Sequence, residues 1–121
     1  MEHFNKLTPA QAEAIHCLQE EEGELLQALG KVTRHGWDSR YIVEGVPVDN
    51  MGDVEREAGH VLAWLAVLTM TTIRGAAIRH AAEEKLEKLL GPGSDLIHHV
   101  PSSVLRDALA YLREPRPLGL R

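Results

Sequence analysis

Apolar residues recur at alternating steps of three and four in two separate stretches of this chain, a period that restricts those stretches to amphipathic α-helices. The first series is Ile15, Leu18, Glu22, Leu25, Leu29 and Val32, which only Glu22 interrupts. The second series is Val54, Ala58, Val61, Leu65 and Leu68. At ~100° per residue, each series lies along one side of a helix. The sequence therefore predicts two long helices, each with one side that packs against a partner.

Start and stop signals locate the first helix. Thr8 is followed by Pro9 and then by Gln11, which is the arrangement of a capping box with proline in the first turn. Gly36 is a stop signal beyond the basic residues of the last turn. We expect this helix to span about residues 9–33.

Residues 37–50 lose the helical period and contain Gly45 and Pro47, so we expect a loop over about 34–50. A short β-hairpin on 41–43 and 46–48 fits within it. A second helix should follow over about residues 51–73. Because that helix is apolar almost all round along part of its length, we expect it to be the central one.

Two further helices follow in the sequence. We expect one over about residues 75–90 and a shorter one over about 103–113, which a serine can cap. Aromatic residues make up only 4% of the chain, so the core must be aliphatic. The predicted fold is a single all-α domain over 1–121, a small bundle of three main helices plus a short C-terminal helix. A chain of this length buries only a modest core, so self-association is expected.

The composition excludes several classes of function. A net charge of −5 argues against a nucleic-acid surface, since phosphate contacts need clustered Lys and Arg. An acidic chain can still bind an anionic substrate through a divalent cation. No apolar run approaches the ~20 residues that span a bilayer, so we expect no membrane partner. The single cysteine, Cys17, fits a reducing compartment, and we expect a soluble cytoplasmic protein.

Two pairs of polar residues sit at corresponding places on the two long helices. Glu21 and Glu24 flank the first apolar stripe, and Glu57 and His60 flank the second at similar angles. Groups at i and i+3 point from the same side of a helix, so two facing pairs can supply four ligands to one cation. Magnesium commonly links protein carboxylates to substrate phosphates. The alternative is that these acidic flanks are simply solvated.

The residues around these pairs resemble a known family. Glu-Glu-Glu-Gly-Glu-Leu-Leu-Gln-Ala at 20–28 resembles the Glu-Glu-x-x-Glu motif of the MazG-like all-α nucleoside triphosphate pyrophosphohydrolases. Glu-Ala-Gly-His-Val-Leu at 57–62 resembles their Glu-x-x-Asp motif. The lysine-rich segment 84–88 is similar to the one that closes the family's third helix. The resemblance covers about residues 12–90.

The resemblance implies an oligomeric MazG-like architecture, either a homodimer or a homotetramer. It implies Mg²⁺-dependent cleavage of a nucleoside triphosphate between its α and β phosphates, which gives the monophosphate and pyrophosphate. Glu21, Glu24 and Glu57 would be metal ligands, and His60 stands where the family has Asp. The catalytic candidates are Glu21 and its neighbour Glu20, which could act as an outer group or a general base.

His60 departs from the family pattern. Imidazole is a softer ligand than carboxylate, so it shifts preference from Mg²⁺ toward Mn²⁺ or Zn²⁺. The lost negative charge could be supplied by Asp53, one turn before Glu57. Three readings stay open: a working ligand in a variant site, a group beside a three-carboxylate site, or the mark of lost activity. The last would make the chain an inactive or weakly active nucleotide-binding or interaction module.

Several residues are candidates for contacts with the substrate. Lys31, Arg34, Lys85 and Lys88 could neutralise substrate phosphates, or could be ordinary solvated surface residues. Trp64 shares the flank of Glu57 and could stack on a base, or could pack in the core.

Overall fold

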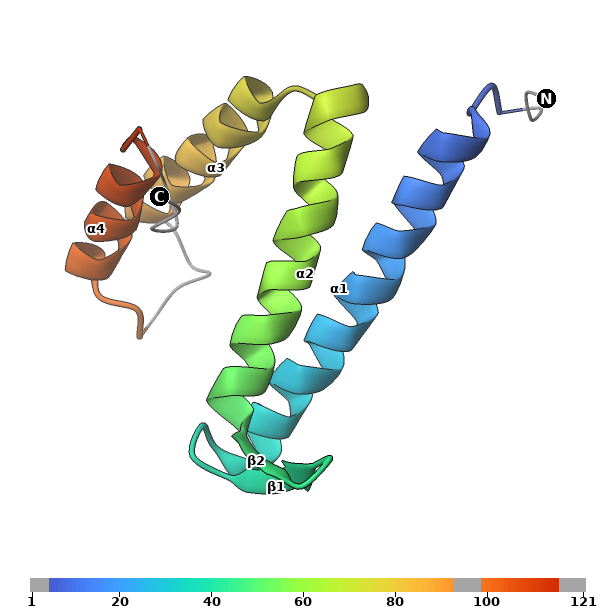
Figure 1. Ribbon diagram of the computed structural model, residues 1–121. Coiled ribbons are helices and arrows are strands. Elements are labelled where there is room, and N and C mark those ends of the chain that lie inside the picture. The colour runs from blue at the N-terminus through green and yellow to red at the C-terminus, as the bar shows by residue number, and fades with distance from the viewer. Residues whose placement is uncertain (1–4, 93–98, 116–121) are drawn as a thin grey trace. The chain divides into compact units, whose positions relative to one another are not determined.

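The computed structural model describes residues 5–92 and 99–115, which form four helices and a two-stranded antiparallel sheet (Figure 1). The prediction of a mostly helical protein is therefore confirmed. The chain divides into two compact units, Met1–Ile73 and Arg74–Arg121. The single domain, the MazG-like architecture and the oligomer stay predictions.

The first helix, α1, spans Pro9–His35 and has both predicted end signals. At its start, the Gln11 backbone N–H donates to Thr8 Oγ1 over 3.1 Å, and the Thr8 N–H donates to Gln11 Oε1 over 2.9 Å. At its end, the Gly36 N–H donates to the Val32 carbonyl over 2.7 Å. Gly36 has φ of 81°, in the left-handed region that favours glycine.

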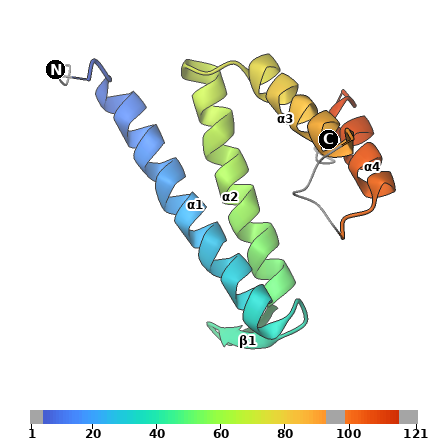
Figure 2. The ribbon, with the colours of Figure 1, turned by 180° about the vertical axis from the view of Figure 1, so that it is seen from behind.

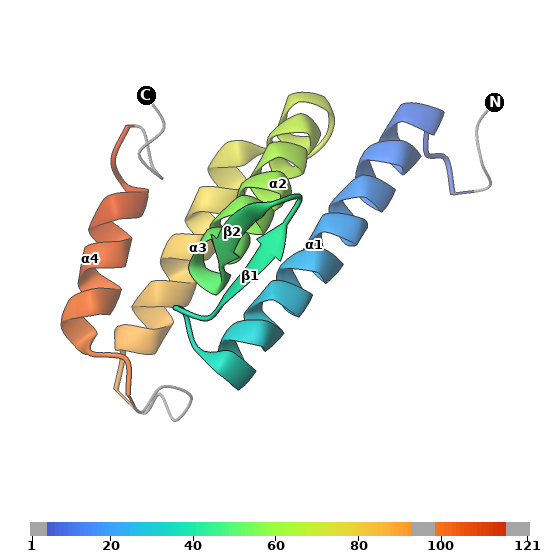
Figure 3. The same ribbon diagram turned by 60° about the horizontal axis from the view of Figure 1, so that its bottom comes forward.

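The predicted hairpin is present in the segment that connects the two long helices. Strand β1 spans Arg40–Val43 and strand β2 spans Val46–Asp49, paired antiparallel (Figure 3). Glu44 and Gly45 connect them with φ of 50° and 78°, as a two-residue hairpin turn with positive φ at both positions requires. This reversal sends the next helix back along α1, so the two run antiparallel and side by side (Figures 1 and 2).

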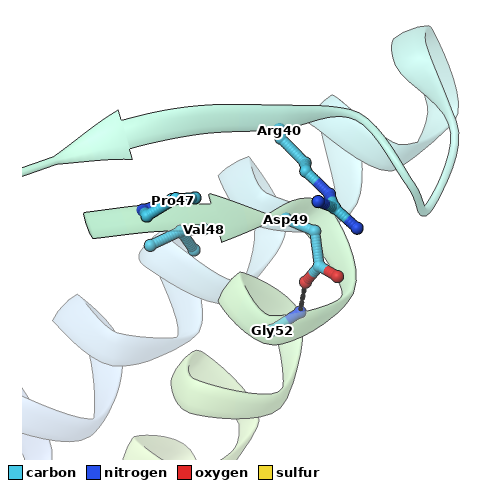
Figure 4. A pocket seen from close by; sticks show the side chains of 5 residues that line it. All are labelled: Arg40, Pro47, Val48, Asp49 and Gly52. Atoms are coloured by element: carbon cyan, nitrogen blue, oxygen red, sulfur yellow. Dashed lines mark hydrogen bonds between the residues drawn. The ribbon is translucent and has the colours of Figure 1, made fainter. Parts of the chain in front are cut away.

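Helix α2 spans Asn50–Thr71, close to the predicted 51–73. Asp49 caps it, because its carboxylate accepts the Gly52 N–H over 2.7 Å (Figure 4). The Asn50 side chain is buried and donates to the Gly36 carbonyl over 2.9 Å. This bond ties the start of α2 to the end of α1 and helps to fix their register.

The α1–α2 pair buries an unusual mixture of side chains. Ala14, Ala28 and Leu68 are its buried apolar residues, and its buried polar residues include Asp53 and Glu57. Carboxylates are rarely buried without a partner, because losing water costs a charged group several kcal/mol. Asp53 and Glu57 therefore need positively charged side chains or a metal ion close to them.

The second unit consists of α3, Gly75–Leu90, and α4, Ser102–Leu112, with bounds within about a residue of those predicted. The predicted serine cap of α4 is wrong, because Pro101 stands at the N-cap and no side chain caps the helix. Arg113 connects them, with Nη2 2.8 Å from Glu87 Oε1. Leu105 is buried in this unit. Among the helices of residues 5–92 and 99–115, none combines the length and apolar character that crossing a bilayer requires.

Candidate metal centre

The two predicted pairs meet between α1 and α2. Glu21 and Glu24 of α1 and Glu57 and His60 of α2 each offer one ligand atom, and these atoms all lie within 4.8 Å of one another. We call these four residues the metal cluster. The i,i+3 spacing brings each pair to one side of its helix, and the antiparallel packing brings the sides together. The expected convergence of the four side chains is confirmed.

Burial changes across the metal cluster. The Glu57 side chain is only 10% exposed and that of Glu21 is mostly buried, whereas the His60 side chain is half exposed. Glu24 is exposed. The cluster therefore has a closed floor and an accessible mouth, through which a cation with water or substrate ligands could enter.

Two carboxylate oxygens on this floor have no hydrogen-bond donor of good geometry within the described part of the chain. His60 Nδ1 lies 3.3 Å from Glu21 Oε2 and 3.4 Å from Glu57 Oε2. Neither oxygen accepts a hydrogen bond of good geometry from the described residues, although both are buried. A buried acceptor without a donor costs ~1–3 kcal/mol, and more when it is charged. Oxygen and imidazole donors converging in this way fit a divalent cation.

The electrostatics agree with that fit. A hydrogen bond with the Glu57 carboxylate and the negative charges of Glu21 and Glu57 raise the pKa of Glu24 above its ordinary value of 4.5. Glu24 therefore resists ionisation in the absence of a cation. A bound divalent cation would reverse this effect, because its charge favours the ionised forms.

Asp53 does not join the metal cluster. Its side chain is only 7% exposed; Oδ1 accepts a hydrogen bond from Arg56 Nη2, and Oδ2 lies 3.8 Å from Lys31 Nζ. Arg56 Nη2 also lies 3.4 Å from Glu57 Oε1. Both carboxylate oxygens of Asp53 therefore face positively charged side chains. The sequence suggested a different role for Asp53, that of a metal ligand.

A polar pocket of about 200 Å³ adjoins the metal cluster and shares Glu24 and Glu57 with it. Its other lining residues are Gln27, Ala28, Lys31, Tyr41, Asp53 and Arg56. We call this the side pocket. Lys31 Nζ lies 4.8 Å from the centre of the Tyr41 ring, a cation–π contact between α1 and the hairpin.

The remaining predicted site residues lie in different parts of the structure. Lys31 lines the side pocket, whereas Glu20, Arg34 and Trp64 do not. Glu20 and Arg34 are exposed on α1, and Trp64 is partly buried on α2. The charge of Glu20 still reaches the site, since it contributes to the raised pKa of Glu24. Lys85 and Lys88 are exposed on α3, in the second unit.

Sequence reasoning missed Arg56 and Tyr41. Arg56 carried a usable signal, because it directly precedes Glu57 and stands three residues after Asp53, on the same side of α2. Tyr41 carried none, since its position follows from how the hairpin folds against the helices.

A larger hollow, of about 270 Å³, lies beside the hairpin (Figure 4). Arg40, Pro47, Val48, Asp49 and Gly52 line it. Its one carboxylate, that of Asp49, already caps α2. This hollow therefore offers no set of metal ligands, despite its size.

Comparison of the chain with protein-family models, curated proteins and solved structures found no match. The features of this chain that indicate a function are therefore its two motifs and the geometry of the metal cluster.

Proposed function

We propose that this chain is a divalent-metal-dependent nucleoside triphosphate pyrophosphohydrolase, which converts a (d)NTP to its monophosphate and pyrophosphate. The observation that carries the proposal is the convergence of the four metal-cluster side chains from two helices. The same residues carry the resemblance to the MazG-like family, so sequence and geometry point to one site.

Glu21, Glu24 and Glu57 would hold the cation, Mg²⁺ or Mn²⁺, with oxygens that are otherwise unpaired or mutually repulsive. When bound, the cation would offset phosphate charge and make water a better nucleophile. Glu20 is exposed on α1, and its charge contributes to the raised pKa of Glu24, so it is our candidate to accept the proton of the attacking water. The buried floor of the cluster limits access of bulk water to one side.

Of the three readings of His60, the geometry favours a working ligand. Its Nδ1 lies 3.3 and 3.4 Å from the two oxygens that accept no hydrogen bond of good geometry from the described residues. A nitrogen donor in place of a carboxylate leaves one fewer negative charge and a softer site. We therefore propose that Mn²⁺ supports activity better than Mg²⁺.

Lys31 is the predicted substrate contact best placed to act, because it lines the side pocket beside the cluster. Arg34, Trp64, Lys85 and Lys88 remain proposals for further phosphate or base contacts. A homodimer or homotetramer is also proposed, since the first unit buries few apolar side chains and leaves large ones such as Leu26 and Met70 exposed.

The test is product analysis with purified protein and a panel of common and modified nucleotides, each with Mg²⁺ or Mn²⁺. We expect equal amounts of monophosphate and pyrophosphate from at least one nucleotide, and loss of both products with Glu57→Gln. The matched control is Glu55→Gln, which changes an exposed carboxylate of the same helix. Release of orthophosphate instead of pyrophosphate would contradict the proposal.

His60 also supports a second candidate, a MazG-like protein that binds nucleotide without cleaving it. In that case the same panel would give nucleotide binding that depends on the metal, with no product from any nucleotide. A chain that binds neither metal nor nucleotide would exclude both candidates.

A further inference from the structure

We propose that Lys31 and Arg56 form the subsite for the outer phosphates of the substrate, and that Asp53 is the positioning residue that holds both cations there. This inference rests on the proposed function, which it extends from the metal to the part of the substrate released as pyrophosphate. It assigns to Asp53 a role different from metal ligation.

Asp53 is placed to orient cations from two helices at once. It is nearly fully buried on α2, where Arg56 lies one turn further along, and Lys31 reaches it from α1. Each of its oxygens faces one of the two cations. A buried carboxylate that is shared in this way fixes the positions of both charged groups at the wall of the side pocket.

Both cations keep the capacity to bind an anion. The Lys31 and Arg56 side chains remain 44% and 47% exposed while they contact Asp53. A guanidinium carries five N–H donors in a planar fork, and an ammonium carries three. Arg56 turns Nη2 toward Asp53 and Glu57, so donors remain for phosphate oxygens.

The charges of the side pocket fit phosphate once a divalent cation is bound beside it. The lining has two basic side chains, Lys31 and Arg56, and three carboxylates, Asp53, Glu24 and Glu57, which give a net charge of −1. A divalent cation held by Glu24 and Glu57 would change this net charge to +1. The side pocket has Glu24 and Glu57 in its wall, so a phosphate that bridges to the cation can also reach Lys31 or Arg56. The Tyr41 ring supports the Lys31 ammonium from the hairpin side.

A purely structural role is the competing explanation, in which Arg56 only offsets the charges of Asp53 and Glu57. The two explanations differ in what the variants lose. A structural role affects folding or metal binding, whereas a phosphate subsite affects the affinity for pyrophosphate and the KM for nucleotide.

The experiment is calorimetric titration of inorganic pyrophosphate into the 121-residue chain with Mn²⁺, after a separate titration of Mn²⁺ alone. The variants are Lys31→Met, Arg56→Met, Arg56→Lys and Asp53→Asn. Arg106→Met is the control, since Arg106 is exposed on α4 and lines neither described hollow. Circular dichroism verifies that each variant is folded.

We expect Lys31→Met and Arg56→Met to weaken pyrophosphate binding roughly tenfold or more, as for the loss of a charge-assisted hydrogen bond. Their Mn²⁺ affinity should stay close to that of the unaltered chain. Arg56→Lys should recover part of the loss, and Asp53→Asn should weaken pyrophosphate binding through misplaced cations. In the nucleotide assay, KM should rise more than kcat falls.

Unchanged pyrophosphate affinity in Lys31→Met and in the folded Arg56 variants would overturn this inference and leave the proposed function standing. Absence of Mn²⁺ binding by the unaltered chain would instead overturn the proposed function itself. Where Arg56→Met does not fold, Arg56→Lys and Lys31→Met decide the question.

Discussion

His60 on α2 lies with its Nδ1 3.3 Å from Glu21 Oε2 on α1, so the imidazole and the carboxylate meet across the helix pair. The contact brings a nitrogen base to an oxygen that accepts no hydrogen bond of good geometry from the described residues. A proton or a divalent cation can occupy the space between them. This choice between proton and metal underlies the predictions for the site.

The first prediction concerns His60→Asp, which replaces the imidazole with a hard, charged ligand. Activity with Mg²⁺ should rise relative to activity with Mn²⁺, because carboxylate suits Mg²⁺ better than imidazole does. The measurement is the ratio of the two initial rates at saturating metal. A ratio equal to that of the unaltered chain would show that His60 is not a ligand.

The second prediction concerns the pH dependence of metal binding. Glu24 must lose its proton to bind a cation, and its pKa is raised by the Glu57 hydrogen bond and by the charges of Glu21 and Glu57. Mn²⁺ should therefore bind with full affinity above this raised pKa. The affinity should fall as the pH drops through the raised pKa, and this fall should begin at a pH above the ordinary value of 4.5.

Titration of Mn²⁺ in two buffers with different ionisation enthalpies measures the protons released. The variant His60→Asn removes the contribution of the imidazole, so release that persists in it comes from the carboxylates. Mn²⁺ binding that releases no proton from this variant as the pH approaches the raised pKa would contradict the assignment of Glu24.

The third prediction concerns the stability of the metal-free protein. A raised pKa means that ionised Glu24 destabilises the fold above that pKa, and that the cost disappears as the pH falls to 4.5 and below. Glu24→Gln should therefore raise the Tm at neutral pH without metal, and should have no effect at acid pH.

With saturating Mn²⁺ at neutral pH, the unaltered chain should instead have a higher Tm than Glu24→Gln, because a ligand that binds only the folded state stabilises it. Thermal melts followed by circular dichroism measure both effects, with Glu22→Gln as the control for an exposed neighbouring carboxylate. Equal shifts in the two variants would exclude a specific role of Glu24.

The fourth prediction tests how α2 is anchored. Asp49→Ala removes the cap on the Gly52 N–H and should cost about 1 kcal/mol in the free energy of unfolding. Asn50→Ala removes a part-buried bond to Gly36, which should cost about 0.5–1.5 kcal/mol and loosen the register of the two helices. Urea denaturation measures the stability, and Mn²⁺ titration measures the site.

Because Asn50 joins the helix ends, its loss should also weaken metal binding, whereas Asp49→Ala should affect mainly stability. An Asn50→Ala protein with full metal affinity would show that the helix packing alone sets the register.

Local signals were enough to predict the helices. The capping box at Thr8 and Gln11 and the glycine at Gly36 determine both ends of α1 through contacts within a few residues. The metal cluster was also predictable, since i,i+3 spacing places each pair on one side of its helix. The two apolar stripes then require those sides to face each other.

The side pocket could not be derived in the same way. Whether Asp53 faces a metal ion or a basic side chain depends on which α1 residue stands opposite it. The identity of that residue depends on the register of the two helices, which the hairpin sets. Lys31 comes within 3.8 Å of Asp53 only through that register. Tyr41 of the hairpin contacts Lys31 of α1, and no short-range pattern encodes a contact between these two elements.

The most direct test of the account is Mn²⁺ binding to the unaltered chain, followed by electron paramagnetic resonance and calorimetry, beside Glu57→Gln and Glu55→Gln. One Mn²⁺ should bind per chain, and Glu57→Gln should lose roughly 10- to 100-fold or more in affinity while Glu55→Gln loses none. No binding, or equal binding by Glu57→Gln and the unaltered chain, would contradict the account.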